Sequence, residues 1–284
     1  MKLLDGSQYS KELDIEYLNR VDILKTKNIT PCLAVILVGD SVQSKIYINM
    51  KRKRCEKIGI KFVLINLKFE IYDEDILDEI EKLNTDPNIN GILVQLPLPK
   101  HIDSDVVIKK INPKKDVDGF HFNNFGKLSL NLMTNYYKPC TPLGCIRLLE
   151  RYNIDLLGKD IVVIGKSNIV GLPLSLLLMH KEATVTVCHI HTKNLKEKTK
   201  MADIICVGCG VPNLITKDLL KPGAVLIDIG INKINVEGKM KIVGDVDFDG
   251  CSEIASYISP VPGGIGPMTI SMLIENLLNS CEYL

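Results

Sequence analysis

The amino-acid sequence predicts an α/β protein with two parallel-sheet domains, the second of them Rossmann-like and doubly wound. Strand-length apolar runs alternate with helical segments from residue 33 to residue 96. A second alternation begins with four β-branched residues at 161–164, which precede a glycine turn and an apolar segment of helical length, 172–180. Such alternation is typical of parallel sheets with right-handed crossovers. A stretch without periodicity, 120–141, separates the two patterns and is predicted to be a linker.

The first half of the chain is predicted to begin with a helix and then to alternate strands and helices. Asp40 and Ser41 are candidate N-caps, and Gly59 suits the end of the helix that follows them. A polar turn is expected at 112–119. The predicted strands are 33–38, 62–67 and 91–96, and the predicted helices are 6–24, 41–58, 73–83 and 103–111.

The second half is organised around the segment that contains Gly165 and Gly171. A strand, a glycine turn and a helix aim backbone N–H groups and a helix N-terminus at a phosphate. Ser167 replaces the middle glycine of the usual spacing, so a tight turn of an ordinary α/β protein is the alternative. The predicted strands are 161–165, 183–189, 203–208, 224–229 and 241–246, and the predicted helices are 142–152, 170–180, 194–201 and 268–281.

Composition excludes several classes of protein. The chain has 284 residues, with 35 Lys plus Arg against 34 Asp plus Glu, and no Trp. This balance argues against nucleic acid as a partner, because no global positive field or base-stacking surface is expected. No apolar run of about 18 residues and no signal-peptide pattern occur, so we expect a cytoplasmic protein with no membrane partner.

The nine cysteines include one CxxC pair, Cys206 and Cys209. The pair lies in an apolar run without a second pair, whereas zinc sites need four converging ligands. Redox CxxC pairs usually open a helix. We therefore expect reduced thiols of a strand and the core. The five histidines show no ligand spacing, and no metal is expected.

Tyr47 and Lys51 are the first candidates for a proton-transfer pair, because they lie four residues apart and project from one helix face. The alternative is a solvated basic helix, since four more cations follow by residue 57. Gln95 ends an apolar strand, where ligands of open α/β sheets bind. Asp116 and Asp118 lie in a turn that Gly119 closes, where one can cap a loop while the other faces a ligand.

Five segments carry a family resemblance. They are 47–51 (Tyr-Ile-Asn-Met-Lys), 91–99 (Gly-Ile-Leu-Val-Gln-Leu-Pro-Leu-Pro), 115–119 (Lys-Asp-Val-Asp-Gly), 139–142 (Pro-Cys-Thr-Pro) and 260–269 (Pro-Val-Pro-Gly-Gly-Ile-Gly-Pro-Met-Thr). Together, and in this order, they resemble the bifunctional methylenetetrahydrofolate dehydrogenase/cyclohydrolase family over essentially the whole chain. The last segment is the most specific.

The resemblance implies an enzyme of folate one-carbon metabolism. Methylene-tetrahydrofolate loses a hydride to a nicotinamide cofactor, and the methenyl product is hydrolysed to formyl-tetrahydrofolate. It also implies a homodimer, with a cleft between a folate-binding catalytic domain and an NAD(P)-binding domain. The folate domain is expected at 1–139 joined by a C-terminal helix at 268–284, and the NAD(P) domain at 140–267.

The same resemblance implies the roles of the site residues. Lys51 is the proton-transfer group of the hydrolytic step, Tyr47 orients it and the substrate, and Gln95 holds it in place. A lysine acts as a base only when neutral, and tuned lysines reach a pKa of roughly 7–8. Asp118 is expected to grip the amino-pyrimidine edge of the pterin. The remaining expected folate contacts are Val94, Leu96, Pro262, Gly263 and Gly264.

The expected cofactor is NADP, with NAD as the alternative. The strand after the glycine turn ends without the acidic residue that favours NAD, and Lys166 offers a cation for a 2′-phosphate. Ile190 stands where many family members have Ser or Arg, so phosphate recognition rests on Lys166 and His191. The expected cofactor contacts are Gly165, Lys166, Ser167, Gly171, His189, Ile190 and Ile231.

Rival interpretations are a nucleotide-sensing or scaffold protein without catalysis, and a dehydrogenase with little cyclohydrolase activity. The joint presence of Tyr47, Lys51, Gln95 and Asp118 argues against the first. Nothing in the sequence separates the rates of the two activities.

Overall fold

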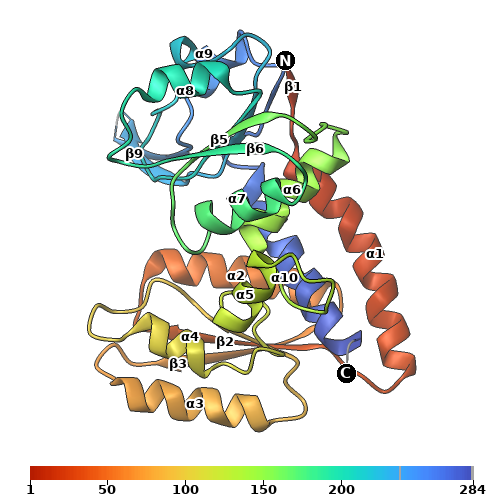
Figure 1. Cartoon of the computed structure of the whole chain (residues 1–284). Coiled ribbons are helices and arrows are strands. Elements are labelled where there is room, and N and C mark those ends of the chain that lie inside the picture. The colour runs from red at the N-terminus through yellow and green to blue at the C-terminus, as the bar shows by residue number, and fades with distance from the viewer. Residues whose placement is uncertain (237, 283–284) are drawn as a thin grey trace. The chain divides into compact units, whose positions relative to one another are not determined.

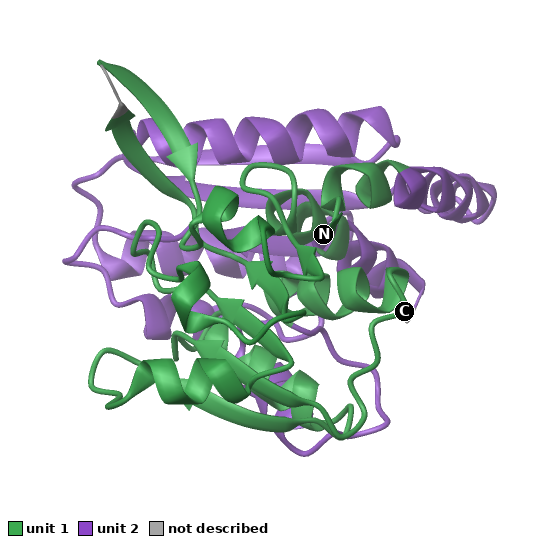
Figure 2. Ribbon diagram, turned by 90° about the horizontal axis from the view of Figure 1, so that it is seen from above, with its two compact units in different colours: residues 1–11, 139–272 green, residues 12–138, 273–284 purple. Residues whose placement is uncertain are grey.

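The chain forms two compact units, which Figure 2 colours separately. The computed structural model describes residues 1–236 and 238–282. Unit 1 comprises residues 1–11 and 139–272, and unit 2 comprises residues 12–138 and 273–284. The first eleven residues group with unit 1, and they include the short strand β1 (Lys2–Leu3), which pairs with β11 (Tyr257–Ile258).

Unit 2 is built on a three-stranded parallel sheet of order β3-β2-β4. Its strands are β2 (Cys32–Val38), β3 (Lys61–Leu67) and β4 (Gly91–Val94). Its helices are α2 (Val42–Lys57), α3 (Asp73–Thr85), α4 (Ser104–Lys110) and α5 (Phe122–Ser129), with parts of α1 (Gly6–Thr26) and α10 (Ile265–Glu282). The predicted parallel sheet of the first half is confirmed.

The central strand β2 is buried along its whole length, as its unbroken apolar sequence requires. Alternate residues Cys32, Ala34 and Ile36 face one side and pack against Ile76 and Ile80 of α3. Helix α3 covers this face of the sheet, and α2 covers the other (Figure 1). Strand β4 stops at Val94, two residues earlier than predicted, so Gln95 is the first residue past the strand.

Unit 1 contains a six-stranded parallel sheet of order β1-β11-β8-β7-β5-β6. Its four longer strands are β5 (Asp160–Ile164), β6 (Thr184–Cys188), β7 (Ile204–Val207) and β8 (Val225–Asp228). The helices are α6 (Cys140–Arg151), α7 (Gly171–Met179), α8 (Leu195–Met201), α9 (Phe248–Ser252) and a 3-10 turn at Lys217–Leu219. This is the predicted doubly wound, Rossmann-like arrangement.

The predicted linker at 120–141 is wrong over residues 122–129, which form α5. This helix is anchored by polar contacts that an apolar periodicity does not reveal. The His121 ring Nδ1 accepts a hydrogen bond from the Asn123 backbone N–H at 3.1 Å. The buried Asn124 amide donates to the Pro113 carbonyl at 3.0 Å.

The predicted strand 241–246 is wrong as a member of the main sheet. Strands β9 (Asn232–Val236) and β10 (Lys239–Val243) form a separate antiparallel pair, which is visible as a hairpin of unit 1 in Figure 2. Residues 239–242 are exposed, whereas 244–246 turn inward and are buried. The apolar residues of β10 alternate with lysines, which is typical of an exposed ribbon rather than a buried parallel strand.

In the described residues, none of the helices combines the length and the apolar character that crossing a membrane requires. The last helix begins at Ile265 rather than Met268. Pro267 therefore lies in its first turn, where the missing N–H leaves no helical hydrogen bond unmade.

Candidate active site

Lys51 is a buried lysine of unit 2, with only 5% of its surface exposed. It lies on α2 one turn after Tyr47, and its Nζ is 5.1 Å from the centre of the Tyr47 ring. The same Nζ lies 3.1 Å from Oε1 of Gln95. The structure thus brings together the phenol, amine and amide that the sequence singled out.

Gln95 is held in one orientation. Its Nε2 donates to the Leu96 carbonyl at 2.8 Å, so its Oε1 is the atom that accepts from Lys51. A lysine ammonium has donors only, which makes the opposite amide orientation unfavourable. The residue reaches this position because it follows β4, and its N–H still bonds to the Ile36 carbonyl of the central strand at 2.9 Å.

The basic run after Lys51 is not simply a solvated face. Arg54 Nη2 lies 2.7 Å from one oxygen of Asp14, and Lys57 Nζ lies 3.0 Å from the other. The Arg52 guanidinium lies over the Phe62 ring at 5.4 Å. These cations dock α2 on its neighbours, whereas Lys51 points to Gln95.

Asp116 and Asp118 lie in different environments. Asp116 is 1% exposed and caps the following loop. Its oxygens accept from the N–H groups of Gly119, Phe120 and His121 and from the Asn124 amide, at 2.8 to 3.3 Å. Burial raises the pKa of Asp116, and these donors oppose the shift. Asp118 is half-buried.

A bridge between Ile92 and Asp116 runs parallel to β4. Because the two segments run in the same direction, Asp118 lies nearer the carboxyl end of β4 than Asp116 does. Gln95 lies at this same end. Asn276 of α10 fixes this segment by donating to the Val117 carbonyl at 2.9 Å and to the Lys138 carbonyl at 3.0 Å. The sequence analysis did not identify Asn276. The residue could have been noticed as a polar side chain within an otherwise apolar helix.

In unit 1 the glycine turn after β5 has the predicted form. Gly165 has φ +112°, a value that favours glycine, and α7 begins at Gly171. A Cβ at Gly171 would overlap the Gly165 carbonyl oxygen, so no other residue fits there. The Ser167 hydroxyl accepts from the Val170 N–H at 3.2 Å and so stabilises the turn in place of the missing glycine.

The residues of this turn fit a dinucleotide phosphate, because residues 166–169 are exposed at a helix N-terminus. Lys166 adds a cation there. His189 and His191 follow β6, as predicted, and the His191 N–H donates to the His189 Nδ1 at 3.2 Å. Ile190 between them is 94% exposed, and Ile231 is 58% exposed.

The segment of Pro262, Gly263 and Gly264 has a fixed backbone. The Val261–Pro262 peptide bond is cis, and Gly263 has φ +116°. The Gly263 carbonyl accepts from the Ser7 N–H at 2.8 Å, and the Gly264 N–H donates to the Pro260 carbonyl at 2.8 Å.

The cysteine prediction holds for Cys206, which is buried in β7, but not for Cys209 as a core thiol. Cys209 is exposed after the end of the strand. All nine cysteines are free thiols. Within residues 1–236 and 238–282, no cluster of three His, Cys, Asp or Glu side chains could hold a metal ion.

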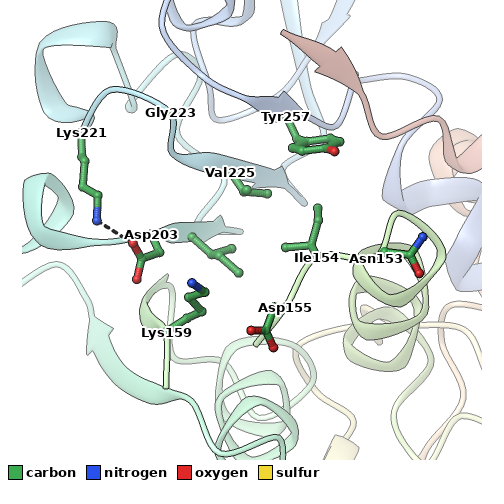
Figure 3. A pocket seen from close by; sticks show the side chains of 10 residues that line it. Asn153, Ile154, Asp155, Lys159, Asp203, Lys221, Gly223, Val225 and Tyr257 are labelled. Carbon is green, nitrogen blue, oxygen red and sulfur yellow. Dashed lines mark hydrogen bonds and ion pairs between the residues drawn. The ribbon is translucent and has the colours of Figure 1, made fainter. Parts of the chain in front are cut away.

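A hollow of about 300 Å³ opens at the amino ends of the strands of unit 1 (Figure 3). Lys221 and Asp203 form an ion pair on its wall. Ligands of open α/β sheets bind at the opposite, carboxyl ends. We therefore do not assign chemistry to this hollow.

These features define a class: an α/β enzyme with a Rossmann-like nucleotide-binding unit and a second unit with a buried lysine. Comparison with known proteins gives the family. The family model for the tetrahydrofolate dehydrogenase/cyclohydrolase catalytic domain matches residues 4–118, and that for the NAD(P)-binding domain matches residues 139–284. The chain belongs to the tetrahydrofolate dehydrogenase/cyclohydrolase family.

Individual relatives agree. Bifunctional protein FolD of Nautilia profundicola is 51% identical over 282 residues, which cover 99% of this chain and 98% of that protein. The crystal structure of the bifunctional FolD of Campylobacter jejuni is 49% identical, with a TM-score of 0.96 and coverage of 100% and 99%. The Trypanosoma brucei FolD, solved with NADP cofactor and inhibitor, is 34% identical, with a TM-score of 0.94 and coverage of 98% and 96%.

Proposed function

We propose that this protein oxidises methylene-tetrahydrofolate with NADP and hydrolyses the resulting methenyl-tetrahydrofolate to formyl-tetrahydrofolate. The observation that carries the proposal is the buried Lys51, held 3.1 Å from the Gln95 amide oxygen, in a chain of this family. In the first step a hydride leaves the methylene carbon, and NADP supplies its acceptor. In the second, water adds to the methenyl carbon and gives up one proton to the base. One carbon–nitrogen bond of the ring then breaks, and the remaining hydroxyl proton passes to the departing nitrogen, which leaves the formyl group.

Lys51 takes the proton from the attacking water in this proposal. Its burial favours the role, because low exposure limits competing solvent and fixes the amine. Gln95 fixes Lys51 through an amide that is itself held by the Leu96 carbonyl. Tyr47 borders the same amine and orients the substrate.

We assign Asp118 to the amino-pyrimidine edge of the pterin, where paired N–H donors suit a carboxylate. The cap made by Asp116 supports this division, since Asp116 already accepts four hydrogen bonds within its own loop. The further proposed folate contacts are Val94, Leu96, Pro262, Gly263 and Gly264.

The proposed nucleotide contacts are Gly165, Lys166, Ser167, Gly171, His189, Ile190 and Ile231. Lys166 is proposed to bind the 2′-phosphate. Its replacement by alanine should lower kcat/KM with NADP about tenfold or more, because a hydrogen bond to a charged group contributes about 1.5–3 kcal/mol. Activity with NAD should change little. Lys200→Ala, an exposed lysine of α8, is the matched control.

The direct test is spectrophotometric. Purified protein is mixed with methylene-tetrahydrofolate and NADP or NAD, and reduced cofactor and methenyl absorbance are followed. Methenyl-tetrahydrofolate supplied alone measures the hydrolase step separately. Absence of both activities in folded protein would overturn the proposal, and faster turnover with NAD would overturn the cofactor assignment.

We also propose that the protein is a homodimer located in the cytoplasm. The separate hairpin β9–β10 supports self-association, because a two-stranded sheet is marginal in water alone. Its Met240 is 65% exposed and Ile242 is 41% exposed. Light scattering coupled to size exclusion tests the dimer, and a monomeric mass at micromolar concentration would contradict it.

A further inference from the structure

Two loops flank the point at which the sheet of unit 1 changes direction. Strand β5 has β6 on one side and β7 on the other, so the chain runs from β5 to β6 and then crosses back over β5 to β7. Ligands of such sheets bind at the carboxyl ends of the strands on either side of this switch point. The loops there are residues 165–170 after β5 and residues 208–210 after β7.

These two loops are in direct contact. A Cβ placed on Gly165 would lie 2.5 Å from the Gly208 carbonyl oxygen and 3.7 Å from the Cys209 nitrogen. The glycine turn is therefore shaped on one side by the backbone of residues 208–210. Any displacement of that backbone moves a wall of the proposed nucleotide site.

The loop 208–210 is held by the carboxylate of Asp245, which is fully buried. One oxygen accepts from the Cys209 N–H at 2.7 Å and from the Gly210 N–H at 3.0 Å. The other accepts from the Asn232 side-chain amide at 2.8 Å. Partial desolvation of the sulfur and the nearby Asp245 carboxylate raise the pKa of the Cys209 thiol to about 11, although the residue as a whole is exposed, so the loop presents no thiolate to a phosphate.

Asp245 is in turn fixed by a second buried carboxylate. Asp228 accepts from the N–H groups of Gly230 at 3.0 Å, Asp245 at 2.9 Å and Val246 at 3.0 Å. The packing is reciprocal, because a Cβ on Gly244 would overlap the Asp228 carboxylate and a Cβ on Gly230 would overlap that of Asp245. The position of Asp245 is thus determined by the end of β8.

We propose that Asp245 is a positioning residue for nucleotide binding, which sets the conformation of residues 208–210 beside the glycine turn. This inference rests on the proposed function, since it names the residue that shapes the nucleotide site of that reaction. Asp245 itself contacts the loop and not the nucleotide. Its loss should weaken nucleotide binding and leave the hydrolytic step in place, because hydrolysis needs no redox cofactor.

The first test is Asp245→Asn. Both carboxylate oxygens accept hydrogen bonds, so either orientation of the new amide aims its NH₂ group at a donor. The KM for NADP should rise about tenfold, because the loop N–H groups or the Asn232 amide lose their acceptor and the loop beside the glycine turn is no longer held in place. The KM for methylene-tetrahydrofolate and the cyclohydrolase rate with supplied methenyl-tetrahydrofolate should stay near their wild-type values.

The matched control is Asp203→Asn. Asp203 precedes β7, at the opposite end of this strand from the loop 208–210, and its carboxylate accepts from the Asp160 N–H at 3.0 Å. It also pairs with Lys221. This variant loses a comparable acceptor in the same unit and should keep the wild-type KM for NADP.

A second variant separates positioning from general damage. In Asn232→Asp combined with Asp245→Asn, the amide at position 245 can donate to the carboxylate introduced at position 232, while its oxygen faces the loop N–H groups. Nucleotide affinity should return toward the wild-type value. An unchanged KM for NADP in folded Asp245→Asn, or failure of the double variant to improve on it, overturns the inference. Wild-type protein without either activity would instead overturn the proposed function.

Discussion

The Lys51 amine and the Gln95 amide meet at 3.1 Å although 44 residues separate them in the chain. One belongs to the helix that follows β2, and the other is the first residue past β4. Because β2 and β4 are parallel neighbours, their carboxyl ends lie at the same edge of the sheet. The contact between Lys51 and Gln95 therefore follows from the order of the strands in the sheet rather than from proximity in sequence.

Replacement of Lys51 by methionine should abolish cyclohydrolase activity while much of the dehydrogenase activity remains. Water addition needs a proton acceptor, whereas hydride transfer depends on geometry, and general base catalysis typically contributes about 10²–10⁴-fold. Both rates are measured on the same preparation. Lys53→Met, an exposed lysine of the same helix, is the control. Equal loss of the two activities in folded protein would count against the assigned role.

Gln95→Glu should reduce cyclohydrolase activity at neutral pH and restore part of it at higher pH. The new carboxylate lies beside Lys51 and favours the charged ammonium, which cannot act as a base. It also loses the donor that binds the Leu96 carbonyl. A pH–rate profile checks this, with Gln43→Glu on the exposed face of α2 as the control. A profile identical to that of the wild type would contradict the proposed partnership.

Asp118→Asn should weaken folate binding by roughly 2–5 kcal/mol, the range for breaking a buried hydrogen-bonded charge contact. Nucleotide binding should be unchanged. Calorimetric titration with each ligand measures both. Asp116→Asn provides the contrast, because its carboxylate caps the loop and its loss should lower the free energy of unfolding by about 1–3 kcal/mol. An unchanged folate dissociation constant in Asp118→Asn would refute the assignment.

Asp228 should make unit 1 relatively more stable as pH falls from about 6 toward 4. Burial, together with Asp245, raises the pKa of Asp228 to about 6 from 3.8, although three backbone N–H groups oppose the shift. The folded protein then binds this proton more tightly than the unfolded chain, so stability rises as pH falls through this window. At about 1.4 kcal/mol per pKa unit, the gain is at most about 3 kcal/mol.

The measurement is the difference in thermal midpoint between wild-type protein and Asp228→Asn across this pH range. The difference should grow in favour of the wild type at lower pH. If the three N–H donors outweigh burial and lower the pKa of Asp228, the wild type loses stability relative to the variant as pH falls. A difference in thermal midpoint that shrinks toward low pH would therefore contradict the prediction.

The sequence by itself determined the elements whose environment is uniform. Strand β2 is apolar throughout and is buried on both faces, so its pattern could be interpreted without its neighbours. The turn from Gly165 to Gly171 could also be predicted, because backbone at that spacing tolerates few residues other than glycine. Tyr47 and Lys51 could be paired because one helical turn separates them.

Only the tertiary structure decided what depends on partners far along the chain. Helix α5 is anchored by Asn124 and His121, polar residues whose partners no periodicity identifies. Strand β10 pairs with β9 in a separate antiparallel hairpin, because the partner of a strand is decided by the tertiary structure and not by the strand's own residues. Asp116, Asp228 and Asp245 look like surface acids in sequence. They are buried because backbone N–H groups from converging loops satisfy their oxygens, and that convergence exists only after the sheet has formed.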